Sequence, residues 1–174
     1  MATRTANPFS EAFSFEFSGP LAGYWLVMLR VITGWWFLHA GLSKLLESGL
    51  TYSYAPIYLK GMTGTALGGI PVWMGTNMGP FLQAWVPLGE FLIGLGLVVG
   101  ALVRLASIFG AMFMVLFWVG NAEFAHGLVN GDLMGLLLFV TMIVFATGRY
   151  YGLDAIIERW SVVERYPRLR YLLG

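Results

Sequence analysis

Four ionisable side chains lie within or at the end of long apolar stretches of this 174-residue sequence. Arg30 and His39 lie in the first stretch, and Lys44 lies close to its end. Glu90 lies in the second stretch. An ionisable group inside a membrane helix costs about 2.5–3.5 kcal/mol on insertion scales, so each of these groups needs a structural or functional reason.

The depths of two of these groups favour an intramembrane pair. At about 1.5 Å of rise per helical residue, Arg30 and Glu90 are predicted to differ in depth by roughly 8 Å, within reach of two long side chains. His39 lies on the opposite helix face from Arg30 because the two are nine residues apart. We therefore predict an Arg30–Glu90 pair, which is either a structural clamp or part of a functional site. The stripe predicted to face inward contains Arg30, Gly34, Phe37, Gly41 and Lys44.

A second group of polar residues is predicted at the outer end of the molecule. Three interpretations stay open for it: a wet loop region, a site that exchanges protons or holds a quinone headgroup, and a metal site. The metal signal is weak, because the sequence has only two histidines and no His-x-x-x-His pair, so no metal is expected. The group comprises His39, Lys44, Asn121, Glu123, His126 and Asp132.

The chain contains no cysteine, which excludes disulfides, iron–sulfur ligation and cysteine nucleophiles. Redox chemistry would therefore depend on a bound cofactor, a substrate or a partner. We expect no covalent cofactor, and a quinone is the candidate for a bound one. Catalytic residues for a complete reaction are not identified, so the chain is expected to be accessory rather than an enzyme by itself.

The elements that must position these residues are membrane helices. Hydrophobic residues make up 58% of the chain and charged residues 11%, whereas soluble proteins have roughly a quarter of their residues charged. A hydrocarbon core of about 30 Å needs roughly 20 helical residues, and four apolar stretches are long enough. Only helices or closed barrels satisfy the backbone in lipid, and the stretches lack the alternation of barrel strands. We predict an all-α integral membrane four-helix bundle with helices at 24–46, 81–103, 105–125 and 133–151.

Three segments follow along the chain: an N-terminal interfacial segment (1–23), the transmembrane domain (24–153) and an amphipathic basic tail (154–174). Within the tail, Asp154 to Arg165 is predicted to form one short amphipathic helix. A long apolar outer loop joins helices one and two, and it acts either as an interfacial cap or as a lid that gates a substrate.

The distribution of Lys and Arg predicts the orientation in the membrane. Seven arginines flank one side of the predicted spans, and two lysines flank the other. This bias places both termini of a multi-pass plasma-membrane protein in the cytoplasm. The arginines are Arg4, Arg104, Arg149, Arg159, Arg165, Arg168 and Arg170, and the lysines are Lys44 and Lys60.

Three stretches together resemble the DoxX family of small four-helix membrane proteins. The first runs from Arg30 to Lys44, and the second contains Gly89-Glu90, a glycine-rich run and Arg104. The third is Gly148-Arg149-Tyr150-Tyr151-Gly152-Leu153-Asp154. The resemblance spans roughly residues 24–157.

The resemblance implies a four-helix fold and a respiratory or sulfur redox context, since the related DoxD proteins are subunits of thiosulfate:quinone oxidoreductase. The expected function is an accessory or quinone-interacting subunit of a membrane oxidoreductase complex. The alternatives are a structural or assembly protein without chemistry and, ranked last, a small oligomeric transporter. Expected partners are the lipid bilayer and either other membrane or redox subunits or further copies of the chain, and no nucleic acid.

Overall fold

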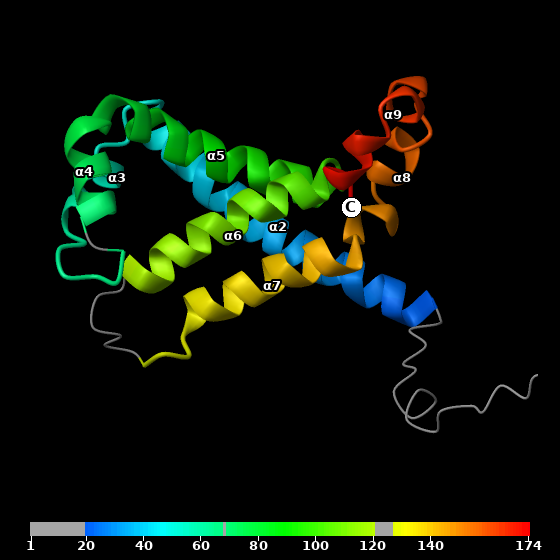
Figure 1. The fold of residues 1–174 in the computed structure, drawn as a ribbon, viewed down its shortest axis with the longest axis horizontal. Helices are drawn as coiled ribbons and strands as arrows, with labels where there is room; N and C mark the ends of the chain where they lie inside the picture. The colour runs from blue at the N-terminus through cyan, green and yellow to red at the C-terminus, as the bar shows by residue number, and fades with distance from the viewer. Residues whose placement is uncertain (1–19, 68, 121–126) are drawn as a thin grey trace, which may run out of the picture.

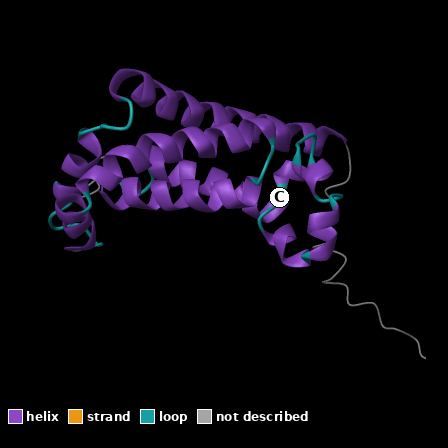
Figure 2. Ribbon diagram, turned by 90° about the horizontal axis from the view of Figure 1, so that it is seen from above, coloured by secondary structure: helices purple, strands orange, loops and turns teal. Residues whose placement is uncertain are grey.

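The computed structural model of the protein describes residues 20–67, 69–120 and 127–174. Every regular element in these ranges is a helix, which confirms the predicted all-α class. Four longer helices pack alongside one another, and short helices cover both ends of the bundle (Figures 1 and 2). The longer helices are α2 (Pro20–Ser48), α5 (Gly79–Val99), α6 (Val103–Gly120) and α7 (Gly131–Phe145).

Three of these helices are long and apolar enough to cross a membrane: α2, α5 and α6. The fourth predicted span is also an apolar helix, but α7 has only 15 residues. At about 1.5 Å per residue it is roughly 22 Å long, shorter than a hydrocarbon core of about 30 Å. Ala146 then adopts a left-handed conformation and ends α7, and the 3₁₀ turn η2 (Thr147–Arg149) follows.

The turn between α5 and α6 lies at 100–102, earlier than the predicted junction at Arg104. Gly100 ends α5 with a φ of 73°, a conformation that glycine adopts without a steric penalty. Arg104 is consequently the second residue of α6. The hydrophobic core between the long helices is formed by Phe37, Ile93, Leu97, Val103, Phe113, Met114, Phe139 and Met142.

Glycines allow the backbones of α2 and α5 to touch. A Cβ atom added to Gly41 would lie 2.2 Å from the backbone nitrogen of Phe91. A Cβ atom added to Gly94 would lie 2.1 Å from the backbone nitrogen of Leu38. Membrane helices associate closely where small residues meet in this way. Arg30, Gly34, Phe37 and Gly41 are all buried, so the predicted inward stripe is confirmed for these four residues.

The substitution Gly94→Ala is expected to lower the free energy of unfolding by about 1–3 kcal/mol, because the new methyl group must push two helix backbones apart. Gly89→Ala on the same helix is the matched control. Its Cβ would lie 3.4 Å from the Phe113 ring, an ordinary contact, so the helix propensity of alanine is expected to stabilise it by up to about 1 kcal/mol. Unfolding of the two variants in mixed detergent micelles measures both changes in the free energy of unfolding. Changes of the same sign would contradict the close contact between α2 and α5 at Gly94.

Short helices cover the two ends of the bundle (Figure 1). At one end, here called the loop end, α3 (Tyr54–Lys60) and α4 (Gly69–Asn77) pack next to the start of α5. This segment corresponds to the predicted outer loop. Its packing is centred on a small apolar cluster of Ala55, Leu59, Met62 and Leu82.

The opposite end, here called the Arg-rich end, holds α8 (Asp154–Ile157), α9 (Ser161–Arg165) and η3 (Pro167–Tyr171). The predicted single helix from Asp154 to Arg165 is wrong, because the backbone becomes extended at Trp160. Val163 is buried while Trp160 remains exposed, so the two do not share one face. Of the predicted N-terminal interfacial segment, residues 1–19 lie outside the described residues.

Candidate functional site

The predicted Arg30–Glu90 pair is wrong. Arg30 is only 2% exposed, and its guanidinium donates hydrogen bonds to three backbone carbonyls where the chain turns after α7. These carbonyls belong to Thr147 at 2.6 Å, Tyr150 at 3.0 Å and Tyr151 at 3.3 Å. The sequence argument considered only side-chain partners, whereas the turn that follows α7 brings free carbonyls to Arg30.

Asp154 forms the second buried polar contact at the Arg-rich end. Its carboxylate accepts hydrogen bonds from the backbone N–H groups of Leu102 at 2.7 Å, Val103 at 3.0 Å and Gly174 at 2.9 Å. The first N–H groups of a helix have no acceptor within that helix, so Asp154 caps the start of α6 from a distant part of the chain. Arg30 thus joins α2 to the turn after α7, and Asp154 joins α8 to the start of α6 and to Gly174. We therefore assign both residues a structural role.

Glu90 instead pairs with Lys44, at the other end of the bundle. The Lys44 ammonium donates to both carboxylate oxygens of Glu90, at 2.6 Å for Oε1. The side chain of Glu90 is 4% exposed and that of Lys44 is 23% exposed. The ammonium also lies 5.4 Å from the centre of the Tyr52 ring, a cation–π distance. The long aliphatic stem of Lys44 lets a residue near the end of α2 reach a carboxylate within α5.

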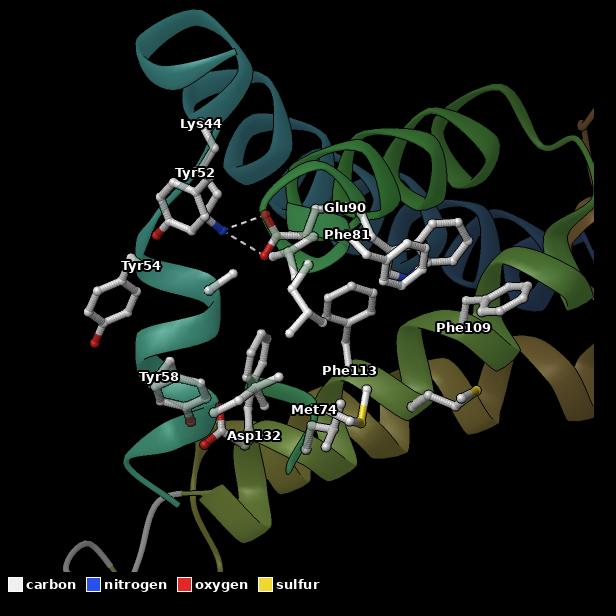
Figure 3. Close-up of a pocket in the computed structure, with 18 residues that line it drawn as sticks. Lys44, Tyr52, Tyr54, Tyr58, Met74, Phe81, Glu90, Phe109, Phe113 and Asp132 are labelled. Atoms are coloured by element: carbon white, nitrogen blue, oxygen red, sulfur yellow. Dashed lines mark hydrogen bonds and ion pairs between the residues drawn. The ribbon is translucent and has the colours of Figure 1, made fainter. Parts of the chain in front are cut away.

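The Lys44–Glu90 pair forms part of the wall of a cavity of about 530 Å³, here called the aromatic pocket (Figure 3). Cavities of roughly 300–1,000 Å³ with apolar walls and a few polar groups are typical of small-molecule sites. Helices α5 and α6 contribute five rings, and the segment that leads into and forms α3 adds three tyrosines. The rings of α5 and α6 are Phe81, Trp85, Phe109, Phe113 and Phe117.

Polar groups lie on two sides of the aromatic pocket. Figure 3 shows Lys44 and Glu90 on one side and Asp132, at the start of α7, on the other beside Tyr58. Burial raises the pKa of the Tyr52 phenol, and the nearby Glu90 charge raises it further. Burial and the charge of Asp132 likewise raise the pKa of the Tyr58 phenol. Both phenols therefore remain protonated at neutral pH and keep a hydrogen-bond donor at the wall of the pocket.

The predicted outer group is brought together only in part. Lys44 and Asp132 line the aromatic pocket, joined there by Glu90. His39 does not line it; the residue is exposed on α2, where its ring lies 6.2 Å from that of Trp35. The remaining predicted members lie outside the described residues, namely Asn121, Glu123 and His126.

Sequence reasoning missed the tyrosines and the α6 aromatic residues as parts of a site. Tyr52, Tyr54 and Tyr58 stood out as aromatic residues in an apolar loop, which was a usable signal. Phe109, Phe113 and Phe117 recur every four residues on α6, a spacing that places them on one helix face. That spacing also fits an ordinary core or lipid-facing stripe, so it could not by itself indicate a pocket.

Comparison with known families places the chain beside a family of membrane proteins. The family model described as DoxX matches residues 25–127, a range that includes Lys44, Glu90 and the pocket walls formed by α3, α5 and α6. Asp132 lies just beyond the matched range. Comparisons with curated proteins and with solved structures returned no match.

Proposed function

Because this chain belongs to the DoxX family of membrane proteins, we propose that it is a membrane subunit of an oxidoreductase complex and that its aromatic pocket binds a quinone ring. One observation carries the proposal: an ion pair between the buried Glu90 and the partly buried Lys44 forms part of the wall of a cavity that is otherwise mainly aromatic and aliphatic. A pocket for a lipid tail alone has no use for a buried charge pair, which is costly to desolvate.

The residues of the pocket fit such a ring. The flat rings of Phe113 and Trp85 offer faces against which a quinone can stack. The Lys44 ammonium can donate to one ring oxygen, and Glu90 holds that ammonium in place. On the other side, the Tyr58 phenol can donate to the second oxygen, and Asp132 beside it can accept a proton in turn.

When bound, a quinone supplies two-electron, two-proton redox chemistry. This chain's contribution is to bind the ring, exclude water from it and hold protons at Lys44 and Tyr58. A partner subunit delivers or removes the electrons in this proposal. The loop end then faces outward and the Arg-rich end faces the cytoplasm, an orientation supported by the arginines of the hairpin and the C-terminal helices.

A photoreactive azido-quinone tests the proposal on the full chain in detergent or nanodiscs. We expect label on peptides from α3 and α6, and an excess of unlabelled quinone is expected to remove it. Leu116→Trp adds bulk to the pocket wall and is expected to reduce labelling about tenfold, a loss of about 1.4 kcal/mol in binding. Ile108→Trp is the matched control, since Ile108 is an exposed residue of the same helix outside the pocket lining.

Labelling that is spread over all apolar helices, or equal in the two tryptophan variants, would contradict a quinone site. The Leu116→Trp variant, whose added indole fills the aromatic pocket, then tests the alternative function. If labelling contradicted a quinone site and this variant still kept its partner subunits, a scaffold protein without chemistry would become the better description. Purification of the Leu116→Trp protein under gentle conditions, with identification of co-purifying chains, measures this.

A further inference from the structure

A second cavity, of about 430 Å³, lies at the Arg-rich end, far from the aromatic pocket. It is here called the basic pocket. It is formed where the start of α6 meets η2 and η3. Its lining comprises Arg104, Arg149, Pro167, Arg168, Arg170 and Tyr171.

The charges of the basic pocket are only partly balanced by acidic groups. Of its four arginines, only Arg149 has a carboxylate of the described residues within ion-pair distance, that of Glu158 at 2.7 Å. Arg104 donates one hydrogen bond, from Nε to the backbone carbonyl of Ile143 at 3.2 Å. Its two terminal amino groups take no part in that bond. Arg168 and Arg170 add two exposed guanidinium groups. An excess of positive charge in one concavity favours an anion, and the planar guanidinium fork matches phosphate oxygens in particular.

The position of the basic pocket indicates where that phosphate comes from. Arg104 is the second residue of the membrane-crossing helix α6, and Arg149 follows the end of α7, so both lie at the level of lipid headgroups. Exposed apolar side chains of Val144 and Phe145 lie on the last turn of α7, close to Arg149 along the chain. They offer a surface for acyl chains beside a headgroup held by the arginines.

From this geometry we propose that the basic pocket binds an anionic phospholipid, with its phosphate held by the arginines and its acyl chains against the end of α7. Basic pockets between membrane helices are known to hold anionic headgroups. This inference does not depend on the quinone proposal, since it concerns the opposite end of the molecule.

Native mass spectrometry of the full chain in detergent tests the lipid site. The purified protein is titrated with phosphatidylglycerol and, separately, with the neutral lipid phosphatidylcholine. The double variant R168Q/R170Q is expected to bind phosphatidylglycerol about 30-fold more weakly, from roughly 1 kcal/mol for each arginine. The matched control is R159Q/R165Q, which removes the same charge from exposed positions in the same segment but outside the basic pocket.

Retained affinity in the control, together with weak binding of phosphatidylcholine, supports the proposal. Equal losses of phosphatidylglycerol affinity in the two double variants would show that general surface charge causes the effect, and would overturn the proposal. Unchanged binding in R168Q/R170Q would also overturn it. A parallel titration with inorganic phosphate separates the two sources of phosphate. Binding of inorganic phosphate as tight as that of the lipid would assign the pocket to a soluble anion instead. The substituted arginines are exposed, so the variants are expected to unfold at the wild-type temperature, which thermal unfolding checks.

Discussion

Replacing Asp154 with alanine is expected to lower the free energy of unfolding by about 3–5 kcal/mol. Three backbone N–H groups lose their acceptor, and two of these are at the start of α6, where no carbonyl of the same helix can replace it. The buried Arg30 guanidinium also loses the negative charge that acts on it from Asp154. Unfolding by a denaturing detergent in mixed micelles, followed by tryptophan fluorescence, measures the change.

The substitution Glu158→Ala provides the comparison for Asp154. Glu158 also carries a carboxylate at the Arg-rich end and pairs with Arg149, but that arginine is 44% exposed. Exposed ion pairs are typically worth less than about 1 kcal/mol, so this variant is expected to stay close to the wild type. If the two variants lost equal stability, Asp154 would be an ordinary surface carboxylate and the capping role would be refuted.

Removing Glu90 alone is expected to be the second large effect, again about 3–5 kcal/mol, because the variant Glu90→Leu leaves the Lys44 ammonium partly buried without its carboxylate. The double variant K44M/E90L removes both charges and is expected to recover much of that loss, since an apolar pair of similar size avoids the cost of desolvation. A double-mutant cycle on unfolding free energies gives the coupling between the two residues. Single variants whose losses simply add would show that the two side chains do not interact.

The same double variant separates a clamp from a binding site. If the pair only joins α2 to α5, a stable K44M/E90L protein keeps its azido-quinone labelling. If Lys44 donates a hydrogen bond to the ring oxygen, the double variant is expected to fold but to lose its azido-quinone labelling. The outcome therefore assigns the role of the pair without depending on whether Glu90→Leu folds.

The positions of the four longer helices could be predicted, because a lipid solvent requires long apolar stretches that are visible in the sequence. Apolar stretches predicted from composition correspond to α2, α5, α6 and α7, with ends that differ by a few residues. The ends differ where local backbone chemistry decides, as at Gly100 and Ala146, whose left-handed conformations stop α5 and α7. Hydropathy contains no information about such single-residue stops, so the predicted fourth span came out too long.

The partners of the charged residues could not be predicted to the same degree. Depth arguments place a residue along the membrane normal but do not fix its neighbours around the helix axis, and they allow only side chains as partners. Arg30 binds backbone carbonyls more than 100 residues away in the chain, and Glu90 binds a lysine that reaches inward from the helix end. Both contacts depend on turns and rotamers that no periodicity specifies.

The contact between Arg30 and the turn after α7 also imposes an order on biosynthesis. Arg30 emerges 117 residues before Thr147, whose carbonyl it binds. At about 5–20 residues per second, the ribosome needs roughly 6–23 s to make the intervening chain. During that interval α2 carries a cation into the membrane without its native acceptors. Helix α2 is therefore made before α5, α6 and α7 but completes its contacts after them, and the end of the bundle that holds Arg30 closes only after α7 has been synthesised.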